Sequence, residues 1–347
     1  MDDQEQFDNA HGVAAGINRA RRHLRPPPSL LPSEWAERSI RIPIGNAVPG
    51  LIRFDNAPYQ REPLDMTANP RCSRITLQWG AQVGKTTLAL CAQAFRIGQN
   101  PQSQIMMQPS QGDLHTWLET KFNPMVDANQ ELQDRIAKPR SREGVNNQNM
   151  KSYPGGFLMF AWSGSPKTMR GRSAPFIVCD ETDGYDRTHE GHPVGLLWQR
   201  AATFADQRLL MEISTPTIKG ASWIESAFEQ GDQRRFHVPC PHCEEVQPLR
   251  WGNVTWDKDS EGQHLPETAG YQCDGCGVVW NDGERVAAIR KGQWVADKPF
   301  RGHASYHLNE LYSCFRRLGD IVQSFLDKKA GGDLQTFVNV SLAETWE

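Results

Sequence analysis

The chain of 347 residues lacks the features of several common protein classes. No apolar run approaches the roughly 18 residues that span a bilayer, and the first five residues are acidic and polar, unlike a signal peptide. Basic charge is not in excess, since 38 Lys and Arg face 41 Asp and Glu; this excludes a uniformly basic nucleic-acid coat but permits a local basic channel. We find no internal repeat. A hydrophobic content of 38% excludes bulk disorder and allows a sizeable core.

The order of short apolar runs and helical patterns predicts the fold class. The predicted strands are 74–79, 104–108, 157–162, 176–179 and 208–214, and the predicted helices are 85–98, 111–129 and 193–205. Strands that alternate with helices are typical of an α/β fold with a mostly parallel central sheet flanked by helices. Helical patterns return at 284–291, 317–329 and 333–343.

A phosphate-binding loop follows the first predicted strand. Residues 80–87, GAQVGKTT, lie between a strand and a helix, where backbone N–H groups of a P-loop cradle phosphate oxygens. Lys85 would reach the β- and γ-phosphates of ATP, and Thr86 would bind Mg²⁺. Trp79 occupies the first glycine position of the usual pattern, so the loop is a variant one. The predicted nucleotide-binding residues of the loop are Gly80, Gln82, Gly84, Lys85, Thr86 and Thr87.

Two acids follow the apolar run 176–179. In P-loop ATPases the first acid, here Asp180, holds Mg²⁺ through water, and the second, here Glu181, activates the attacking water as a general base. Such a pair alone can be an ordinary polar strand end, but together with the P-loop it favours catalysis. We assign a capping or loop role to the nearby Asp183.

Two further segments carry candidate residues. Ser214 ends the strand 208–214 and Thr215 follows it. We predict that these two residues sense loss of the γ-phosphate and couple it to DNA-facing loops. Gln60 lies about 20 residues before the P-loop, where its amide could pair with the edge of adenine while Tyr59 stacks on the base. The alternatives are a strand end and a Pro-bounded turn.

Phosphoryl transfer needs a cation that neutralises developing charge, and the P-loop contains no arginine. Arg170 and Arg172 precede Asp180 and could act in cis or from a neighbouring subunit. A contact with DNA phosphate is an equal alternative for this loop. Arg140 and Arg142 are weaker candidates.

Four of the eight cysteines form two C-x₂-C pairs, Cys240/Cys243 and Cys273/Cys276. A chain without a secretion signal belongs in a reducing compartment, where such pairs indicate metal rather than disulfides. Four thiolates close a tetrahedral Zn²⁺ shell, so we predict a structural zinc ribbon. Four ordinary cysteines are the alternative; His242 could replace one thiolate but is expected to face solvent.

Together these motifs resemble the ATPase part of the large terminase subunit of tailed bacteriophages, of the lambda (GpA-like) type. The resemblance extends from about residue 32 to residue 347. It rests on segments at 59–63 (YQREP), 82–86 (QVGKT), 169–172 (MRGR), 178–181 (VCDE), 214–216 (STP), 238–243 (VPCPHC), 306–309 (YHLN) and 337–347 (FVN…WE).

The resemblance implies an ATP-driven motor that moves double-stranded DNA into a procapsid in the host cell cytoplasm. It further implies a homo-oligomeric ring on the portal protein, a small terminase subunit as partner and no membrane. In related terminases an arginine before the acidic pair acts across the subunit boundary, which favours Arg170. The family also has a ribonuclease-H-like endonuclease domain, which we expect to begin after Glu347, so we expect no nuclease activity here.

We therefore expect a flexible N-terminal arm at 1–33, a P-loop ATPase core at 34–235, a zinc-ribbon insert at 236–283 and a helical C-terminal part at 284–347. The arm contains a basic run at 19–25 and three prolines, which suit either a solvated tail or a contact with a partner or DNA. Two other functions stay open: a helicase-type DNA-remodelling ATPase, and a zinc-ribbon DNA-binding module with a degenerate nucleotide site.

Overall fold

The computed structural model describes residues 30–139, 144–165, 173–189 and 191–347. Residues Pro32–Glu347 form one compact unit. Within the described residues, no helix is long and apolar enough to cross a bilayer.

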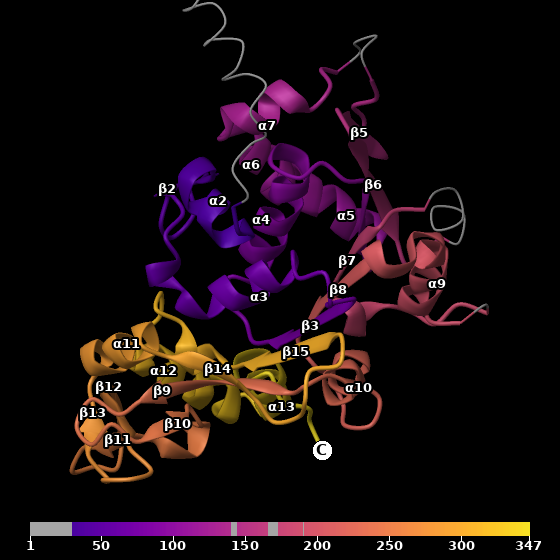
Figure 1. Ribbon diagram of the computed structural model, residues 1–347. Helices are drawn as coiled ribbons and strands as arrows, with labels where there is room; N and C mark the ends of the chain where they lie inside the picture. Colours follow the sequence, from indigo (N-terminus) through magenta and orange to yellow (C-terminus); the bar gives the residue numbers. More distant parts are fainter. Residues whose placement is uncertain (1–29, 140–143, 166–172, 190) are drawn as a thin grey trace, which may run out of the picture. The chain divides into compact units, whose positions relative to one another are not determined.

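A ten-stranded sheet forms the centre of this unit (Figure 1). In spatial order its strands are β10 (Val246–Pro248), β9 (Arg234–Pro239), β15 (His303–Leu308), β3 (Arg74–Trp79), β8 (Leu209–Ser214), β7 (Phe176–Asp180), β4 (Gln104–Gln108), β6 (Gly156–Trp162) and β5 (Met150–Tyr153), with β14 (Gln293–Ala296) paired to β9. All strands from β9 to β6 run parallel, whereas β10, β14 and β5 are antiparallel additions. The predicted mostly parallel α/β sheet is therefore confirmed.

Helices cover both faces of the sheet (Figure 1). One side carries α2 (Pro32–Ser39), α3 (Arg61–Met66), α4 (Lys85–Gly98), α5 (Gln111–Trp117), α6 (Asn123–Asp127) and α7 (Gln130–Arg135). The other face packs on α9 (Pro193–Arg200) and α10 (Trp223–Gln230). Apolar side chains of β4, β6 and β7 meet α9 there. Strands β4 and β7, which are covered on both faces, are buried along their whole length.

Two predicted helices are interrupted. The stretch 111–129 contains a π-helical turn, Leu118–Phe122, between α5 and α6. In the stretch 193–205, helix α9 ends at Arg200 and a 3₁₀ helix, Ala201–Gln207, follows it. Helix α4, in contrast, begins and ends where the sequence predicts.

The C-terminal part differs most from the sequence prediction. We expected 284–347 to be helical, and it does contain α11 (Asp282–Arg290), α12 (Leu318–Ala330), α13 (Leu334–Thr336) and a π-helical turn, Phe337–Leu342. It also contributes β14 and β15 to the main sheet. Strand β15 was not predicted because it lacks the continuous apolar run by which the other central strands were found; three of its six residues are polar. Two of them are buried through specific bonds: the Ser305 hydroxyl donates to the Phe228 carbonyl, and His307 Nε2 lies 3.1 Å from the Ala343 carbonyl.

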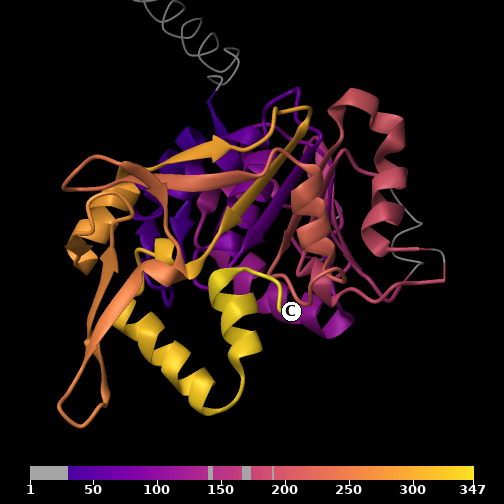
Figure 2. The same ribbon diagram turned by 90° about the horizontal axis from the view of Figure 1, so that it is seen from below.

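The expected insert at 236–283 is likewise joined to the main sheet, through β9 and β10. Its remaining strands, β11 (Val254–Lys258), β12 (His264–Gln272) and β13 (Val279–Trp280), form a separate three-stranded sheet. Helix α12 packs along β12 (Figure 2). A short hairpin of β1 (Arg41–Ile42) and β2 (Gly50–Leu51) completes the described strands.

Candidate functional site

The predicted P-loop connects β3 to α4 at the carboxyl end of the sheet. Gly84 precedes the helix with a φ of +81°, in the left-handed region that favours glycine. A Cβ atom there would lie 2.2 Å from Gln60 Nε2. The loop therefore needs glycine at this position for two independent reasons.

Backbone bonds from the C-terminal part hold the start of the loop. The Gly80 N–H donates to the Leu308 carbonyl at 2.8 Å, and the Ala81 N–H donates to the Val340 carbonyl at 2.7 Å. A Cβ atom at Gly80 would lie 3.0 Å from the Val340 carbonyl oxygen. Gly80 thus allows close packing, and its N–H is already used within the protein.

Lys85 and Glu181 meet where the sequence analysis expected catalysis. Lys85 Nζ lies 3.4 Å from Glu181 Oε1, and the Lys85 side chain is the more buried of the two, at 11% exposed against 46%. Glu181 has a φ of +55°, which a non-glycine residue adopts only under strain. Strain of this kind is concentrated at functional sites.

Asp180 lies at the end of β7 and is buried. Gln108, at the end of the neighbouring β4, donates to Asp180 Oδ2 at 3.1 Å. Burial raises the pKa of Asp180 to about 6, and the nearby Glu181 adds to this rise, while Lys85 opposes it. The Asp180 carboxylate and the half-buried Thr86 hydroxyl are oxygen donors of the kind that Mg²⁺ prefers.

The segment after β8 is connected to the acidic pair through Asp183. The Asp183 N–H donates to Ser214 Oγ at 3.2 Å, and the Ser214 hydroxyl donates to the Thr215 carbonyl at 2.8 Å. The Asp183 carboxylate accepts bonds from the Thr217 hydroxyl and from the N–H of Ile224 in the first turn of α10. Asp183 therefore joins three segments, beyond the capping role we assigned to it.

A cavity of about 220 Å³ lies beside the loop. Four predicted nucleotide-binding residues line it: Gln60, Gln82, Gly84 and Thr87. The Gln60 amide nitrogen donates to the carbonyls of Val83 and Gly84, both at 3.1 Å. Tyr59 is fully buried against Trp79 and Phe236, so the suggestion that it stacks on a base is wrong.

The four paired cysteines also come together. Their Sγ atoms all lie within 4.8 Å of one another, with Cys240 3.9 Å from Cys276 and Cys243 3.8 Å from Cys273. Four thiolates at about 2.3 Å from a zinc ion would lie roughly 3.8 Å apart, so the donor set fits. The His242 imidazole instead lies 3.0 Å from the Glu284 carboxylate, outside the cluster.

The family of this chain follows from sequence comparison. The family described as phage terminase large subunit gpA, ATPase domain, matches residues 46–294, well over half of the chain. The chain belongs to this family.

Two curated terminase large subunits show the same relationship. That of Enterobacteria phage P21 is 26% identical over 377 residues, and that of Escherichia phage lambda is 25% identical over 373 residues. The matches cover 100% and 97% of this chain but only 57% and 55% of the relatives, so the chain spans little more than half their length. The HK97 bacteriophage large terminase has a similar fold, with a TM-score of 0.55 and 17% identity over 91% of this chain and 55% of that one.

A second terminase family description, the gpA endonuclease domain, matches residues 303–347. We expected endonuclease similarity to begin after Glu347. In the structure, residues 303–308 form β15, which pairs with β3 in register from His303–Arg74 to Leu308–Trp79. The boundary between the two family matches therefore falls inside the main sheet of this terminase chain.

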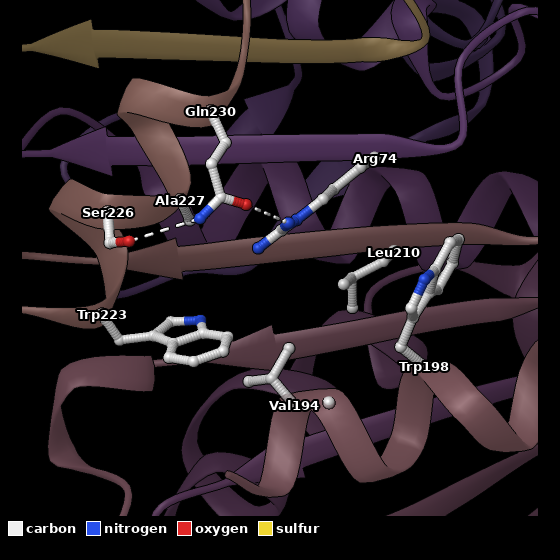
Figure 3. A pocket seen from close by; sticks show the side chains of 9 residues that line it. Arg74, Val194, Trp198, Leu210, Trp223, Ser226, Ala227 and Gln230 are labelled. Atoms are coloured by element: carbon white, nitrogen blue, oxygen red, sulfur yellow. Dashed lines mark hydrogen bonds between the residues drawn. The ribbon is translucent and has the colours of Figure 1, made fainter.

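A second cavity, of about 130 Å³, lies between α9 and α10 (Figure 3). Trp198 and Trp223 line its sides, and the Arg74 guanidinium reaches into it from β3. That guanidinium is bound by Gln230 Oε1 at 3.1 Å and by the buried Glu212 carboxylate at 2.5 Å. Because Arg74 begins β3 and the P-loop follows its end, this cavity is separate from the candidate nucleotide site.

The predicted arginines lie outside the described residues, namely Arg140, Arg142, Arg170 and Arg172. Sequence reasoning missed Gln108 and the C-terminal residues that support the loop. Gln108 carries a detectable signal, because it ends a predicted strand as Asp180 does and parallel strands end at one edge. The Leu308 and Val340 carbonyls carry none, because their role depends on strand order.

Proposed function

We propose that this chain is the ATPase motor domain of a phage terminase large subunit, which hydrolyses ATP to translocate double-stranded DNA into procapsids. The observation that carries the proposal is the pairing of Lys85 with Glu181 beside the buried Asp180. Lys85 begins α4 after the loop that follows β3, and Asp180 and Glu181 lie at the end of β7. Strands β3 and β7 are separated only by β8, and such an edge of the sheet is where α/β proteins bind ligands.

In this proposal the loop residues Gln82, Gly84, Lys85, Thr86 and Thr87 hold the triphosphate, and Gly80 acts through close packing. Lys85 leaves Glu181 for the phosphates when ATP binds, which frees the carboxylate. Glu181 then accepts a proton from water, whose oxygen forms a bond to the γ-phosphorus as the bond to the β,γ-bridging oxygen breaks, giving ADP and phosphate. Mg²⁺, held by Thr86 and through water by Asp180, would neutralise phosphate charge.

The coupling role of Ser214 and Thr215 is supported by the bonds through Asp183. Loss of the γ-phosphate alters the surroundings of Glu181, two residues before Asp183. Because Asp183 is bonded to Ser214, Thr217 and Ile224, a shift there moves the segment after β8 and the start of α10 together.

Arg170 is our proposed source of positive charge for the transition state, in cis or from a neighbouring subunit. Its support comes from topology. The segment between β6 and β7 leaves β6 at the same edge of the sheet as the P-loop, since these strands run parallel.

We further propose that Cys240, Cys243, Cys273 and Cys276 hold a structural Zn²⁺ ion. One knuckle links β9 to β10 and the other links β12 to β13, so the ion would join the main sheet to the small one. A shell of four thiolates has no open position for catalysis.

The partners proposed for the whole protein are double-stranded DNA, the small terminase subunit and the portal protein, with assembly as a homo-oligomeric ring in the host cytoplasm. The small-subunit contact is assigned to the N-terminus, residues 1–30. Family membership and the matched terminase relatives support these assignments.

A DNA-binding role for the ribbon itself is disfavoured by its charge. Exposed acids outnumber exposed bases between residues 240 and 281, and phosphate contacts need Lys and Arg. The acids are Glu244, Glu245, Asp257, Asp259, Glu261, Glu267 and Asp274, and the bases are Arg250 and Lys258.

The test is phosphate release by wild type and by Glu181→Gln, with and without duplex DNA. We expect DNA to stimulate the wild type and Glu181→Gln to lose turnover by about 10²–10⁴-fold, as for removal of a general base. Glu229→Gln, a change at an exposed acid on α10, is the matched control and should remain active. Near wild-type turnover by Glu181→Gln would refute the base assignment.

Two additional readouts separate the competing functions. Strand separation on a tailed duplex would favour a helicase-type enzyme, and absence of hydrolysis at any protein concentration would favour a degenerate site. Mixing Arg170→Ala into wild type tests whether the arginine acts in trans, because trans action makes the loss of rate disproportionate to the mutant fraction.

A further inference from the structure

The far wall of the cavity beside the P-loop comes from a distant part of the chain. Phe315 lines this cavity together with Gln60, Gln82 and Gly84, although it lies 230 residues after Lys85. Its side chain is 40% exposed, which is unusual for a phenylalanine. A partly exposed ring in a cavity offers a face on which a flat aromatic ligand can stack.

Apolar side chains also project into the cavity from the β1–β2 hairpin. Ile42, Val48 and Leu51 line it, and Val48 and Leu51 are themselves 45% and 37% exposed. A purine has two apolar faces and a polar edge, so a slot with apolar walls next to a phosphate-binding loop matches the base of a nucleotide.

The turn that carries Phe315 is held rigidly. The buried Arg285 guanidinium donates to three of its carbonyls, those of Leu311, Ser313 and Arg316, the last two at 3.0 and 2.8 Å. Such a support orders the turn before any ligand arrives, which lowers the entropic cost of binding.

One hydroxyl group connects this turn to the P-loop. Ser313 Oγ donates to the Gln82 carbonyl at 2.9 Å and accepts from the Phe315 N–H at 3.3 Å. Gln82 has a φ of +57°, a conformation that needs such support. The ring and the loop therefore occupy a defined relative position.

The amide nitrogen of Gln60 cannot hold the base. Both hydrogens of the Gln60 amide nitrogen are used by the Val83 and Gly84 carbonyls, so this group has none left for a base. Three further polar residues line the cavity and can bond the edge of the base, while the apolar side chains contact its faces: Asn46, Arg53 and Asn56.

We propose that Phe315 stacks on the adenine ring of bound ATP. This inference rests on the proposed function, because it takes ATP as the substrate. It also means that the ATPase site is completed by residues 303–347, the segment that the endonuclease family description matches.

The test compares Phe315→Ala with wild type in the 347-residue chain. We expect the Kd for ATP, measured by calorimetry, and the KM to rise by roughly tenfold, since the loss of one base–aromatic stack weakens binding by about that factor. The kcat should stay within about twofold, because a stack that persists through the reaction contributes equally to ground state and transition state. Inhibition by inorganic tripolyphosphate, which has no base, should be unchanged.

Phe315→Tyr keeps the ring and should restore the affinity, and Val279→Ala, at an exposed apolar residue of the small sheet, is the matched control. An unchanged Kd for ATP in Phe315→Ala overturns the stacking proposal. An equal loss of tripolyphosphate affinity also overturns it, because it would show that Phe315 only supports the loop. If the wild type binds tripolyphosphate but not ATP, the stack is overturned; if it binds neither, the proposed function fails as well.

Discussion

The nucleotide site and the cysteine cluster are built in opposite ways. The nucleotide site gathers residues from the ends of several parallel strands, and its loop is held by carbonyls as distant in sequence as Leu308 and Val340. The cysteine cluster comes from two knuckles, and each pair of thiols lies within one turn of chain. Long-range strand order thus determines the first site, and local spacing determines most of the second.

A short series of contacts nevertheless links the small sheet beside the cysteine cluster to the P-loop. Trp251, just before β11, packs on Phe337 with ring centroids 4.8 Å apart. Phe337 begins the π-helical turn whose Val340 carbonyl accepts the Ala81 N–H of the P-loop. A disturbance of the small sheet therefore has a short physical route to the nucleotide site.

The largest effect should come from Lys85→Ala. Loss of the ammonium group removes the main cation near the phosphates, so kcat/KM for ATP should fall by about 10³-fold or more. The unfolding temperature should change little, because the partner Glu181 is half exposed. Lys258→Ala, in the small sheet, is the control and should leave phosphate release unchanged; a Lys85→Ala enzyme with near-normal turnover would contradict the site assignment.

Cys273→Ser should have the opposite effect to Lys85→Ala, with a large loss of stability and little change in activity. Loss of one thiolate weakens zinc binding, and the free energy of unfolding should fall by several kcal/mol, on the order of other metal-site losses. Below the new unfolding temperature, KM for ATP should change less than about threefold, through the Trp251–Phe337 contact.

Zinc content and thermal unfolding measure this outcome. Cys72→Ser, at a buried cysteine outside the cluster, should keep one zinc ion per chain. Equal zinc content in Cys273→Ser and wild type would argue against a four-thiolate site.

The smallest expected effect is a change in the free energy of unfolding caused by Asp180→Asn. The pKa of Asp180 is raised to about 6 in the folded protein, above its value near 3.9 in the unfolded chain, so ionisation of this carboxyl opposes folding. The variant should lose ATP hydrolysis. Its free energy of unfolding at pH 8, without Mg²⁺ or nucleotide, should nevertheless exceed that of the wild type by about 1–3 kcal/mol.

The stability difference between Asp180→Asn and wild type should depend on pH. The stabilising effect of the protonated Asp180 is complete below pH 4 and is lost as the pH rises through 6. The difference between Asp180→Asn and wild type should therefore grow between about pH 4 and pH 7 and then level off. Denaturant unfolding at pH 4.5 and pH 8 tests this, and a difference independent of pH would show that burial of the charge is not its cause.

Much of the fold was predictable because its central strands are apolar and its P-loop helix has clear ends. Strands β3, β4 and β7 and helix α4 were found at or within one residue of their observed limits. Strands β9, β10 and β14 were not predicted. Polar residues alternate along β9, and β10 and β14 are only three and four residues long.

The residues of the candidate site also divide into those that local sequence predicts and those that depend on distant neighbours. Lys85 begins a helix that the sequence predicts, and Asp180 and Glu181 follow a predicted strand. Tyr59 and Gly80 were given ligand contacts, but the structure buries Tyr59 and uses the Gly80 N–H internally. In both cases a residue that is remote in sequence takes the contact: Phe236 packs on the Tyr59 ring, and the Leu308 carbonyl accepts the Gly80 N–H.

The sequence by itself determined the phosphate loop, the acidic pair and the cysteine knuckles, because each depends on residues a few positions apart. Only the tertiary structure decided that β15 lies between β9 and β3. That placement depends on burying polar side chains such as Ser305 and His307 through partners from other elements, which no local pattern encodes. It brings Leu308, Ser313 and Phe315 to the nucleotide site, and so joins residues 303–347 to the ATPase sheet.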